Sequence, residues 1–176
     1  MIQLERLARL LRQASQTQGL NPAQWEALRY VSRANFLSNT PGALARYLGA
    51  TKGTTSQTVL ALIKKGLVVK TTRSADARSV ILTLSEAGQM ALRDDPLRGI
   101  EKSLAALKPK TALRFGKGLT IILGDETERQ NEPLFGVCTT CAHAALKHGL
   151  THCKAEAVSI PEDETHKLCF HFKMKK

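Results

Sequence analysis

The feature that most constrains the fold is a pair of short helical patterns separated by a tight turn, after which the apolar period changes. The first pattern begins at Thr40, a capping residue followed by proline, and ends at Gly49. The second begins at Lys52 and ends at Gly66. Capping residues and proline favour helix starts, and glycine favours helix ends. The sequence therefore predicts two helices joined by a short turn, which is a helix-turn-helix.

The residues after Gly66 predict a β-hairpin. Residues 67–72 are rich in β-branched side chains, residues 73–77 are polar, and apolar residues alternate along residues 79–84. Alternation with a period of two is typical of strands, and a polar stretch between two strands is typical of a turn. A hairpin beside a helix-turn-helix is a wing, so we expect a mainly α fold built on a winged helix-turn-helix domain.

Amphipathic helices are predicted on both sides of this core. Leucines at helical spacing predict a first helix within residues 1–19, and Asn21 followed by proline predicts the start of a second. Beyond Ser85 the helical pattern continues with interruptions at Pro96 and Pro109, because proline cannot donate the helical hydrogen bond.

The chain is strongly basic. Lysine and arginine number 26 against 15 aspartate and glutamate residues, which gives a formal net charge of +11. Such an excess attracts polyanions, of which nucleic acid is the commonest in a cell. Within residues 44–84 the cations are opposed only by Asp76. These cations are Arg46, Lys52, Lys64, Lys65, Lys70, Arg73 and Arg78. We therefore expect double-stranded DNA as the partner of this region.

The patterns divide the chain into three parts. Residues 1–123 are expected to form the winged helix-turn-helix DNA-binding and dimerisation domain, residues 124–136 a polar linker, and residues 137–176 a cysteine- and histidine-rich segment. The first helix and residues 107–122 carry more apolar side chains than one small domain can cover. We therefore expect these flanking helices to form the interface of a homodimer.

No stretch of the chain has the apolar core of a signal peptide or the roughly 20 apolar residues of a membrane span. The N-terminal pattern is interrupted by Glu5, Arg6, Arg9 and Arg12. We therefore expect a cytoplasmic protein with no membrane partner. Its four cysteines would then lie in a reducing compartment, where metal or redox chemistry is commoner than a structural disulfide.

From residue 20 to residue 123 the chain resembles the MarR family of winged-helix regulators. The resemblance rests on the run Leu-Ala-Arg-Tyr-Leu at 44–48, the turn Ala-Thr-Lys at 50–52, the helix ending at 62–68, and an ordered set of wing residues. The wing residues are Asp76, Arg78, Val80, Leu82, Leu84, Ser85 and Gly88.

The resemblance implies a two-fold dimer, formed by the first helix and the last two helices of the domain, that represses or activates at a pseudo-palindromic operator. Many members of the family also bind a small phenolic or other aromatic effector between the dimerisation and DNA-binding regions. The chain departs from the family at Ser85, where threonine is usual, and at Ala77, where many members have two adjacent basic residues. Its wing therefore has fewer charges for contacts with DNA.

The second helix of the motif would present its N-terminal residues to base edges in the major groove. The DNA-binding residues expected on it are Lys52, Thr54, Thr55, Ser56, Gln57 and Thr58. The Gln57 amide can bond adenine through two hydrogen bonds, and hydroxyl groups can bond phosphates or bases. Arg73 and Arg78 of the wing would reach the minor groove or the backbone. Serine and threonine at a helix start also serve as plain caps, so the patch is better supported than any single contact.

All four cysteines lie in the last quarter of the chain: Cys138, Cys141, Cys153 and Cys169. The first two form a CxxC knuckle, which can present two sulfurs to one metal. The histidines crowd the same segment: His143, His148, His152, His166 and His171. We expect a metal at a four-cysteine site, with Zn²⁺ favoured and an iron–sulfur cluster as the alternative. A CxxC thiol pair that senses oxidants without metal is the third possibility.

Two further function classes compete with a DNA-binding regulator. One is a cysteine-dependent enzyme with Cys138 or Cys141 as nucleophile, but no catalytic motif, phosphate loop or paired carboxylates support it. The other is a metal-handling or partner-binding module that has lost DNA binding, and the polar start of the second helix argues against it. We therefore expect no enzymatic activity. The cysteine segment has few large apolar residues, so we expect it to need its metal to fold and the preceding domain to fold without it.

Overall fold

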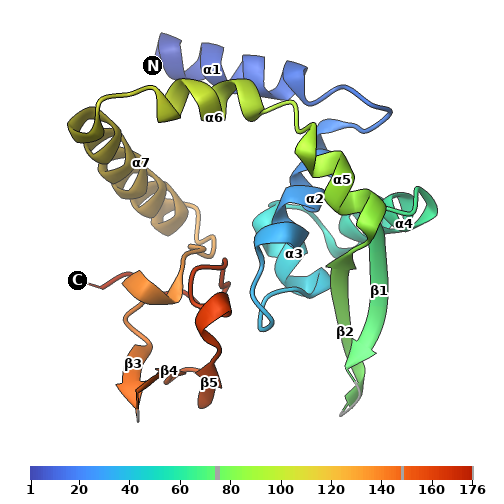
Figure 1. Cartoon of the computed structure of the whole chain (residues 1–176), viewed down its shortest axis with the longest axis vertical. Helices are drawn as coiled ribbons and strands as arrows, with labels where there is room; N and C mark the ends of the chain where they lie inside the picture. The colour runs from blue at the N-terminus through green and yellow to red at the C-terminus, as the bar shows by residue number, and fades with distance from the viewer. Residues whose placement is uncertain (74–75, 148, 176) are drawn as a thin grey trace.

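The computed structural model of the chain describes the backbone of residues 1–73, 76–147 and 149–175, and the side chains of these residues except 73 and 76–79. The helices are α1 (Ile2–Ala14), α2 (Pro22–Arg33), α3 (Pro41–Tyr47), α4 (Lys52–Lys64), α5 (Glu86–Arg93), α6 (Arg98–Ala105) and α7 (Pro109–Arg129). The strands are β1 (Val68–Arg73), β2 (Asp76–Leu84), β3 (Ala144–Lys147), β4 (Leu150–Cys153) and β5 (Val158–Ile160). Two 3₁₀ turns, η1 (Cys138–Thr140) and η2 (Glu162–Glu164), complete the fold (Figure 1).

The predicted helix-turn-helix and wing are confirmed. Thr40 caps α3 by accepting a hydrogen bond from the Ala43 amide at 3.2 Å, and Thr51 caps α4 by accepting one from the Thr54 amide at 3.2 Å. Strands β1 and β2 pair antiparallel. One face of each element enters a shared core that includes Trp25, Leu28, Leu44, Leu62 and Leu82. We call residues 20–93, from Leu20 to the end of α5, the winged-helix part.

Ser85 and Gly88 join the wing to α5. The Ser85 hydroxyl donates to the Gly66 carbonyl at 2.5 Å and accepts from the Gly88 amide at 3.0 Å, while the Ser85 amide donates to the Leu67 carbonyl at 3.1 Å. A Cβ atom on Gly88 would stand 2.1 Å from that Leu67 carbonyl oxygen, so only glycine fits. The serine and glycine quoted for the family resemblance thus fix α5 against the end of α4.

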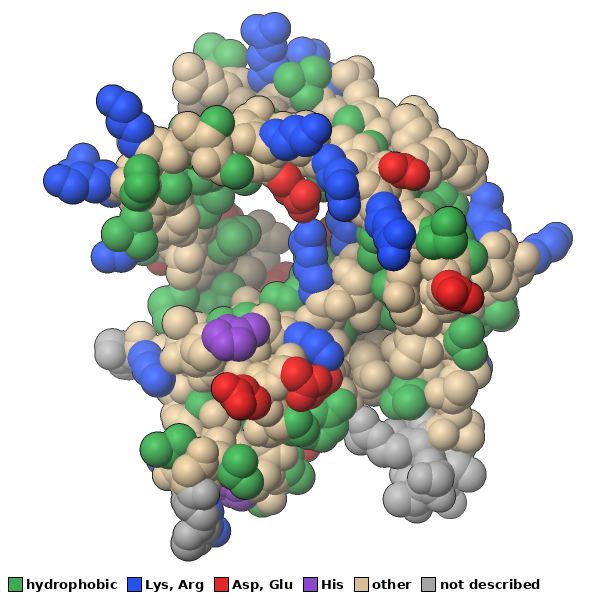
Figure 2. Space-filling model, viewed as in Figure 1, with side chains coloured by type: hydrophobic (Ala, Val, Ile, Leu, Met, Phe, Trp, Pro, Cys, Tyr) green, Lys and Arg blue, Asp and Glu red, His purple; other side chains and the backbone are tan. Residues whose placement is uncertain are grey.

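Helices α1, α6 and α7 contain no buried residue, although each carries an apolar face. In Figure 1, α1 and α6 lie along the upper edge, and α7 descends from α6 to the C-terminal segment. The space-filling view shows the molecule hollowed between α7 and the winged-helix part, with hydrophobic side chains exposed on the α7 side (Figure 2). No helix in the described part of the chain is long and apolar enough to cross a bilayer.

The predicted linker at 124–136 is wrong in its first part, because α7 continues to Arg129. A single glycine costs a helix only about 1 kcal/mol, and no proline follows Gly124 until Pro133. The chain leaves the helix at Asn131, which has a positive φ of 52°.

The segment after α7, residues 130–176, is called the tail below. Its strands form one antiparallel sheet in the order β3–β4–β5. The sequence predicts a tail that is separate from the preceding domain, but in the structure the two are packed together. Phe135, Leu168 and Phe170 pack against the winged-helix core, so the large apolar residues of the tail are used on its neighbour.

Candidate nucleic-acid interface and thiol cluster

The start of α4 presents polar side chains to solvent. Lys52, Thr54, Ser56 and Gln57 are exposed, whereas Thr58 is half-buried. The Thr58 hydroxyl donates to the Thr54 carbonyl at 3.1 Å within the helix. Four of the predicted residues are therefore exposed, so that bases in a groove of DNA could contact them. The Thr58 hydroxyl instead bonds to the backbone of its own helix.

The assignment of Thr55 to the DNA-binding set is wrong. Its side chain is 1% exposed, and its hydroxyl oxygen is buried with no hydrogen-bond partner among the described residues. Helical spacing places residue 55 on the same face as Val59 and Leu62, which are both in the core. The polarity of threonine concealed this position in the sequence, because the buried face of α4 begins one turn earlier than its apolar residues indicate.

For the predicted contacts of the wing with DNA, the structure describes only the backbone of the two arginines. The side chains of Arg73 and Arg78 lie outside the described residues. Lys70 of β1 is exposed and lines a cavity of about 300 Å³ together with Lys52 and Ser56 of α4. A basic, partly apolar recess therefore joins the wing to α4.

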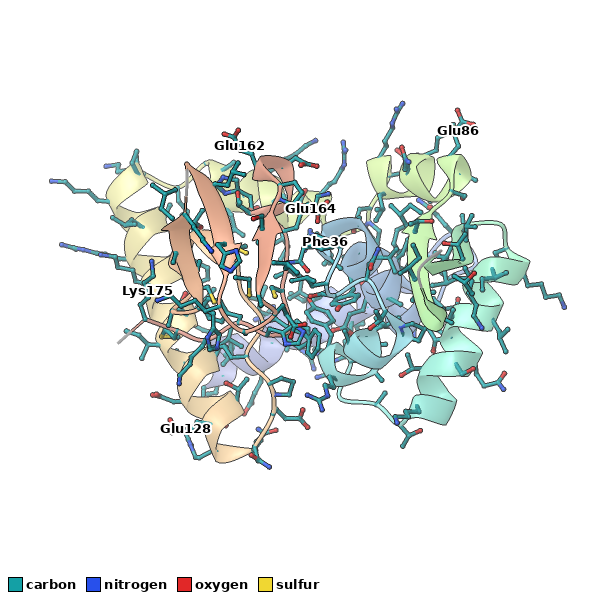
Figure 3. The ribbon with its side chains drawn as sticks, turned by 90° about the horizontal axis from the view of Figure 1, so that it is seen from below. Phe36, Glu86, Glu128, Glu162, Glu164 and Lys175 are labelled. Carbon is teal, nitrogen blue, oxygen red and sulfur yellow. The ribbon has the colours of Figure 1, made fainter. Side chains whose placement is uncertain are left out.

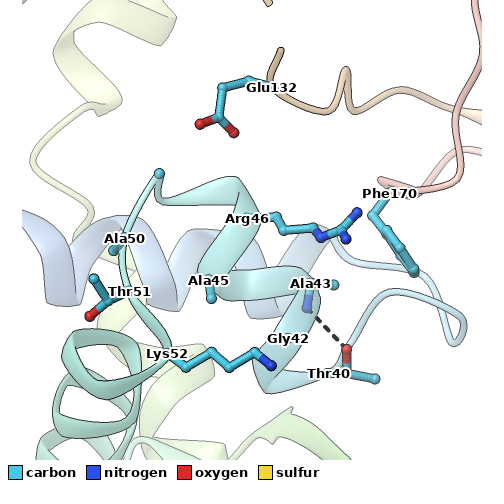
Figure 4. Close-up of a pocket in the computed structure, with 11 residues that line it drawn as sticks. Thr40, Gly42, Ala43, Ala45, Arg46, Ala50, Thr51, Lys52, Glu132 and Phe170 are labelled. Atoms are coloured by element: carbon cyan, nitrogen blue, oxygen red, sulfur yellow. Dashed lines mark hydrogen bonds between the residues drawn. The ribbon is translucent and has the colours of Figure 1, made fainter. Parts of the chain in front are cut away.

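A second recess lies where the tail approaches the turn between α3 and α4. This cavity of about 690 Å³ is lined by both helices and their turn and by Glu132 and Phe170 of the tail. Figure 4 shows Arg46 pointing toward Phe170, with Glu132 and Lys52 on opposite sides. The Arg46 guanidinium lies 5.9 Å from the centre of the Phe170 ring, which is within the range of a cation–π contact.

The tail is hydrogen-bonded to residues 34–39, the loop between α2 and α3, which we call the junction loop. The Leu168 amide donates to the Arg33 carbonyl at 2.7 Å, and the Asn35 amide donates to the Leu168 carbonyl at 2.9 Å. The Phe170 amide donates to the buried Ser38 hydroxyl at 3.0 Å. The Phe36 amide donates to the Glu164 carboxylate at 2.8 Å (Figure 3).

These junction residues were not found from the sequence. The partners of the junction loop lie 128 and 132 residues away along the chain. Backbone hydrogen bonds across such separations leave no local pattern. The one available signal was the concentration of asparagine and serine in the loop, since these side chains often bond to the backbone.

The four cysteines are brought together by three different parts of the tail and are all buried, with exposures of 5–7%. Cys138 and Cys141 bracket η1, Cys153 ends β4, and Cys169 pairs with Gly136 just before η1. We call these four residues the thiol cluster. Cys138 and Cys153 pack with Ile160, Phe36 and Leu37, so the cluster borders the junction loop.

The thiols influence one another electrostatically. The pKa of Cys138 is raised to about 11. Burial is the largest cause, and the neighbouring thiols of Cys169, Cys141 and Cys153 add to it. Burial also raises the pKa of Tyr30 in the winged-helix core, with Cys169 as the next cause. Cys169 of the cluster therefore lies close to the core of the winged-helix part.

As they stand, no three Cys, His, Asp or Glu side chains in the described ranges are arranged as ligands of a metal ion. His171 has its Nδ1 atom 3.1 Å from Glu156 and its ring 3.7 Å from the centre of the Phe170 ring, and His148 lies outside the described residues.

A smaller cavity of about 250 Å³ lies between α1, α2 and the loop that leads into α6. Leu11, Arg12, Arg33 and Tyr47 are among the residues that line it. It therefore stands between the flanking helices and the winged-helix part.

Comparisons with known proteins agree with this geometry. Residues 18–79 match the MarR family. Three solved structures share the fold. A MarR transcriptional regulator from Methanosarcina mazei Go1 is 20% identical over 71% of this chain and 91% of its own, with a TM-score of 0.56. CouR from Rhodococcus jostii RHA1, bound to p-coumaroyl-CoA, is 19% identical over 68% and 87%, with a TM-score of 0.53.

The third structure is MepR of S. aureus in complex with DNA, which is 16% identical over 70% of this chain and 96% of its own, with a TM-score of 0.53. No curated protein matches the chain by sequence. The region that matches the family model, residues 18–79, has the winged-helix fold, and the three solved structures each cover about 70% of the chain.

Proposed function

We propose that this chain is a sequence-specific, DNA-binding transcriptional regulator of the MarR type. The observation that carries the proposal is the exposed polar start of α4, the second capped helix of a winged-helix fold. Lysines flank this start. Lys52 and Lys70 border this surface, and the whole chain has a net charge of +11. A polyanion is the partner that such a surface attracts.

In this proposal α4 lies in the major groove. Gln57 is exposed on α4, and its amide can donate to and accept from adenine at once. Thr54 and Ser56 supply hydroxyl groups beside it, and Lys52 supplies a charge for phosphate. Arg73 and Arg78 remain the proposed wing contacts.

We also propose that the regulator is a homodimer through α1, α6 and α7. These helices and the turn between α6 and α7 expose apolar side chains that a monomer would leave in water. The exposed residues are Ile2, Leu4, Leu10, Leu104, Leu107, Leu113, Phe115, Ile121, Ile122 and Leu123. Large exposed apolar patches on soluble proteins mark interaction sites, and a two-fold dimer matches a pseudo-palindromic operator.

The small cavity between α1 and α2 is the proposed place for an effector. The structure of CouR shows that a protein of this fold can bind p-coumaroyl-CoA. In this chain Arg12 and Arg33 line the cavity with Leu11 and Tyr47, so the ligand chemistry that fits is a small molecule with an apolar body and an acidic group. A regulator that binds such a ligand needs no catalytic residues, and we propose that the chain is not an enzyme.

The test of DNA recognition is selection from a random duplex library with the full chain. We expect an enriched pseudo-palindrome with half-sites about one helical turn apart, and binding that weakens steeply with salt. A library with no enriched sequence after repeated rounds would refute sequence-specific binding. Turnover of a substrate that depends on cysteine and not on DNA would favour the enzyme alternative.

Sedimentation of the full chain tests the dimer separately. At micromolar concentration we expect the mass of two chains. A mass equal to one chain, 19.3 kDa, would show that the apolar faces of α1, α6 and α7 are covered in some other way.

A further inference from the structure

We infer that Cys138, Cys141, Cys153 and Cys169 bind one zinc ion, and that this zinc site holds the junction loop in the position from which α3 begins. The first half concerns the tail alone. The second half rests on the proposed DNA-binding function, because it makes zinc a determinant of DNA affinity.

The chemistry of the donor set supports a soft divalent metal. Four thiols are the complete ligand set of a closed structural zinc site, and all four are buried here. Because no three side chains in the described ranges are now arranged as metal ligands, zinc would have to draw the four sulfurs together. Cys138 and Cys141 come from one turn, in which the Cys141 amide donates to the Cys138 carbonyl at 3.1 Å. Cys153 and Cys169 come from a strand end and from a segment next to Gly136. A knuckle plus two ligands from separate elements would join the whole tail.

Without a metal, the four buried thiols would contribute little to the stability of the tail. The apolar interior of the tail is small: Ile160, Val158 and Ala144 pack with Cys138 and Cys153. The larger residues Phe135, Leu168 and Phe170 pack on the winged-helix core instead. Zn²⁺ would displace four thiol protons, one from each sulfur, and form four Zn–S bonds of about 2.3 Å. We choose zinc over an iron–sulfur cluster because four thiolates complete the coordination of one zinc ion without added sulfide.

The route from the cluster to the DNA-binding part runs through both neighbours of Cys169. On one side, Leu168 exchanges hydrogen bonds with the backbone at Arg33 and Asn35, at 2.7 and 2.9 Å. On the other side, the Phe170 amide donates to the Ser38 hydroxyl at 3.0 Å. The Tyr30 hydroxyl donates to the Ser38 carbonyl at 2.6 Å, so Ser38 joins the tail to the core of the winged-helix part.

The junction loop is also connected to both DNA-binding elements. Its end leads directly into the cap of α3, and the Leu82 amide of β2 donates to the Asn39 carbonyl at 2.7 Å. Two buried amide atoms of the loop, Nδ2 of Asn35 and Oδ1 of Asn39, have no hydrogen-bond partner among the described residues. A loop with incompletely satisfied polar groups depends on its remaining contacts, and several of these come from the tail. Fixing Cys169 by zinc therefore fixes the start of α3 and the base of the wing.

Metal analysis of the full chain, purified without oxygen or added metal, tests the site. We expect about one zinc per chain, lost in Cys141→Ser and retained in Thr139→Ala, a matched control at an exposed position of the same turn. Iron with acid-labile sulfide would overturn the zinc assignment. Less than a tenth of an equivalent of any metal, with four freely titratable thiols, would overturn the metal site.

Binding to the selected duplex, with zinc and after chelation, tests the coupling. We expect the full chain to bind about 5- to 150-fold more weakly after chelation, the range typical of coupled sites, and to recover when zinc is restored. Ser38→Ala should keep its zinc but lose most of this difference, because the Phe170 contact is broken downstream of the metal. Thr139→Ala should behave like the parent chain in both states.

The outcomes separate the two proposals. Equal DNA affinity with and without zinc would refute the coupling and leave the regulator intact. A chain that holds zinc but prefers no DNA sequence in either state would refute the proposed function and leave the zinc site intact. If Cys141→Ser does not fold, the chelation experiment on the parent chain still decides the coupling.

Discussion

At the residue scale, the most informative contact is a buried ion pair between Arg29 and Asp95. The Arg29 guanidinium donates to both carboxylate oxygens, at 2.7 and 2.8 Å, and the Leu97 amide donates to the same carboxylate at 2.8 Å. Burial raises the pKa of Asp95, but the bonds from Arg29 and Leu97 and the charges of Arg29 and Arg33 lower it more, so the net pKa lies below its ordinary value. This pair ties α2 to the segment that leads into the flanking helices.

Replacing Asp95 by asparagine is expected to destabilise the fold by about 3–5 kcal/mol at neutral pH, because a buried guanidinium loses its counter-charge. The lowered pKa means that the ionised carboxylate stabilises the fold above its ordinary pKa, and that this stabilisation disappears as the pH falls through the folded-state value. Denaturant unfolding of parent and variant should therefore converge in acid. Asp94→Asn, with the same charge change at an exposed position, should change stability little. A similar loss in both variants would show that the pair is unimportant.

A second residue-scale prediction concerns Gly88. Gly88→Ala would place a Cβ atom 2.1 Å from the Leu67 carbonyl oxygen, so we expect a loss of about 1–3 kcal/mol or more as α5 is pushed from the wing. Gly99→Ala in α6 is the control, because no atom lies within 4 Å of its Cβ position. Alanine there should be neutral or stabilising by up to about 1 kcal/mol. An equal fall in Tm for both variants, measured by thermal unfolding, would contradict the close approach of residue 88 to the Leu67 carbonyl.

At the element scale, α4 has two faces that the sequence did not separate. Thr55 is buried and its hydroxyl has no partner in the part of the chain that the structure describes, whereas Ser56 beside it is exposed. Thr55→Val keeps the shape and removes the unpaired group, so we expect the free energy of unfolding to rise by roughly 1 kcal/mol while DNA affinity stays unchanged. Loss of DNA binding in Thr55→Val, with a normal fold, would return Thr55 to the DNA-contacting set.

The elements that could be predicted were those with local signals. Thr40 with its following proline located the start of α3, Gly66 the end of α4, and Ser85 the start of α5, because caps act on adjacent backbone. The continuation of α7 beyond Gly124 was missed, because one glycine only weakens a helix. The strands of the tail are short and lack regular alternation. Its docking on the junction loop could not be predicted, since it depends on pairs such as Phe36–Glu164 that are distant in sequence.

At the scale of the whole molecule, the tail acts as a second support of the winged-helix part. Phe135 makes edge-on contacts with Tyr30 and Tyr47, at centroid distances of 6.0 and 5.1 Å, on the face that the tail covers. Removal of the tail would expose this face to water. The sequence pattern predicts a domain independent of the tail, whereas in the structure the two share a core.

A chain ending at Arg129 is therefore expected to be less stable than the full chain by at least about 3 kcal/mol, since Phe135, Leu168 and Phe170 each contribute apolar burial. Thermal unfolding of both chains at equal concentration measures the difference, with the sedimentation mass of each as the control for dimer loss. Equal Tm values for two dimeric chains would show that the tail is an independent appendage after all.

The central claim is that α4 reads DNA sequence, and the most direct test compares the affinities of Gln57→Ala for the selected duplex and for random duplex at one fixed salt concentration. We predict a loss of about 1–3 kcal/mol on the selected duplex, confined to one base position in each half-site, with random binding nearly unchanged. Arg78→Ala, at a proposed contact with the DNA backbone, should weaken binding to both duplexes alike. Equal losses on the two duplexes for Gln57→Ala, or no loss on either, would contradict the account of α4 as the recognition helix.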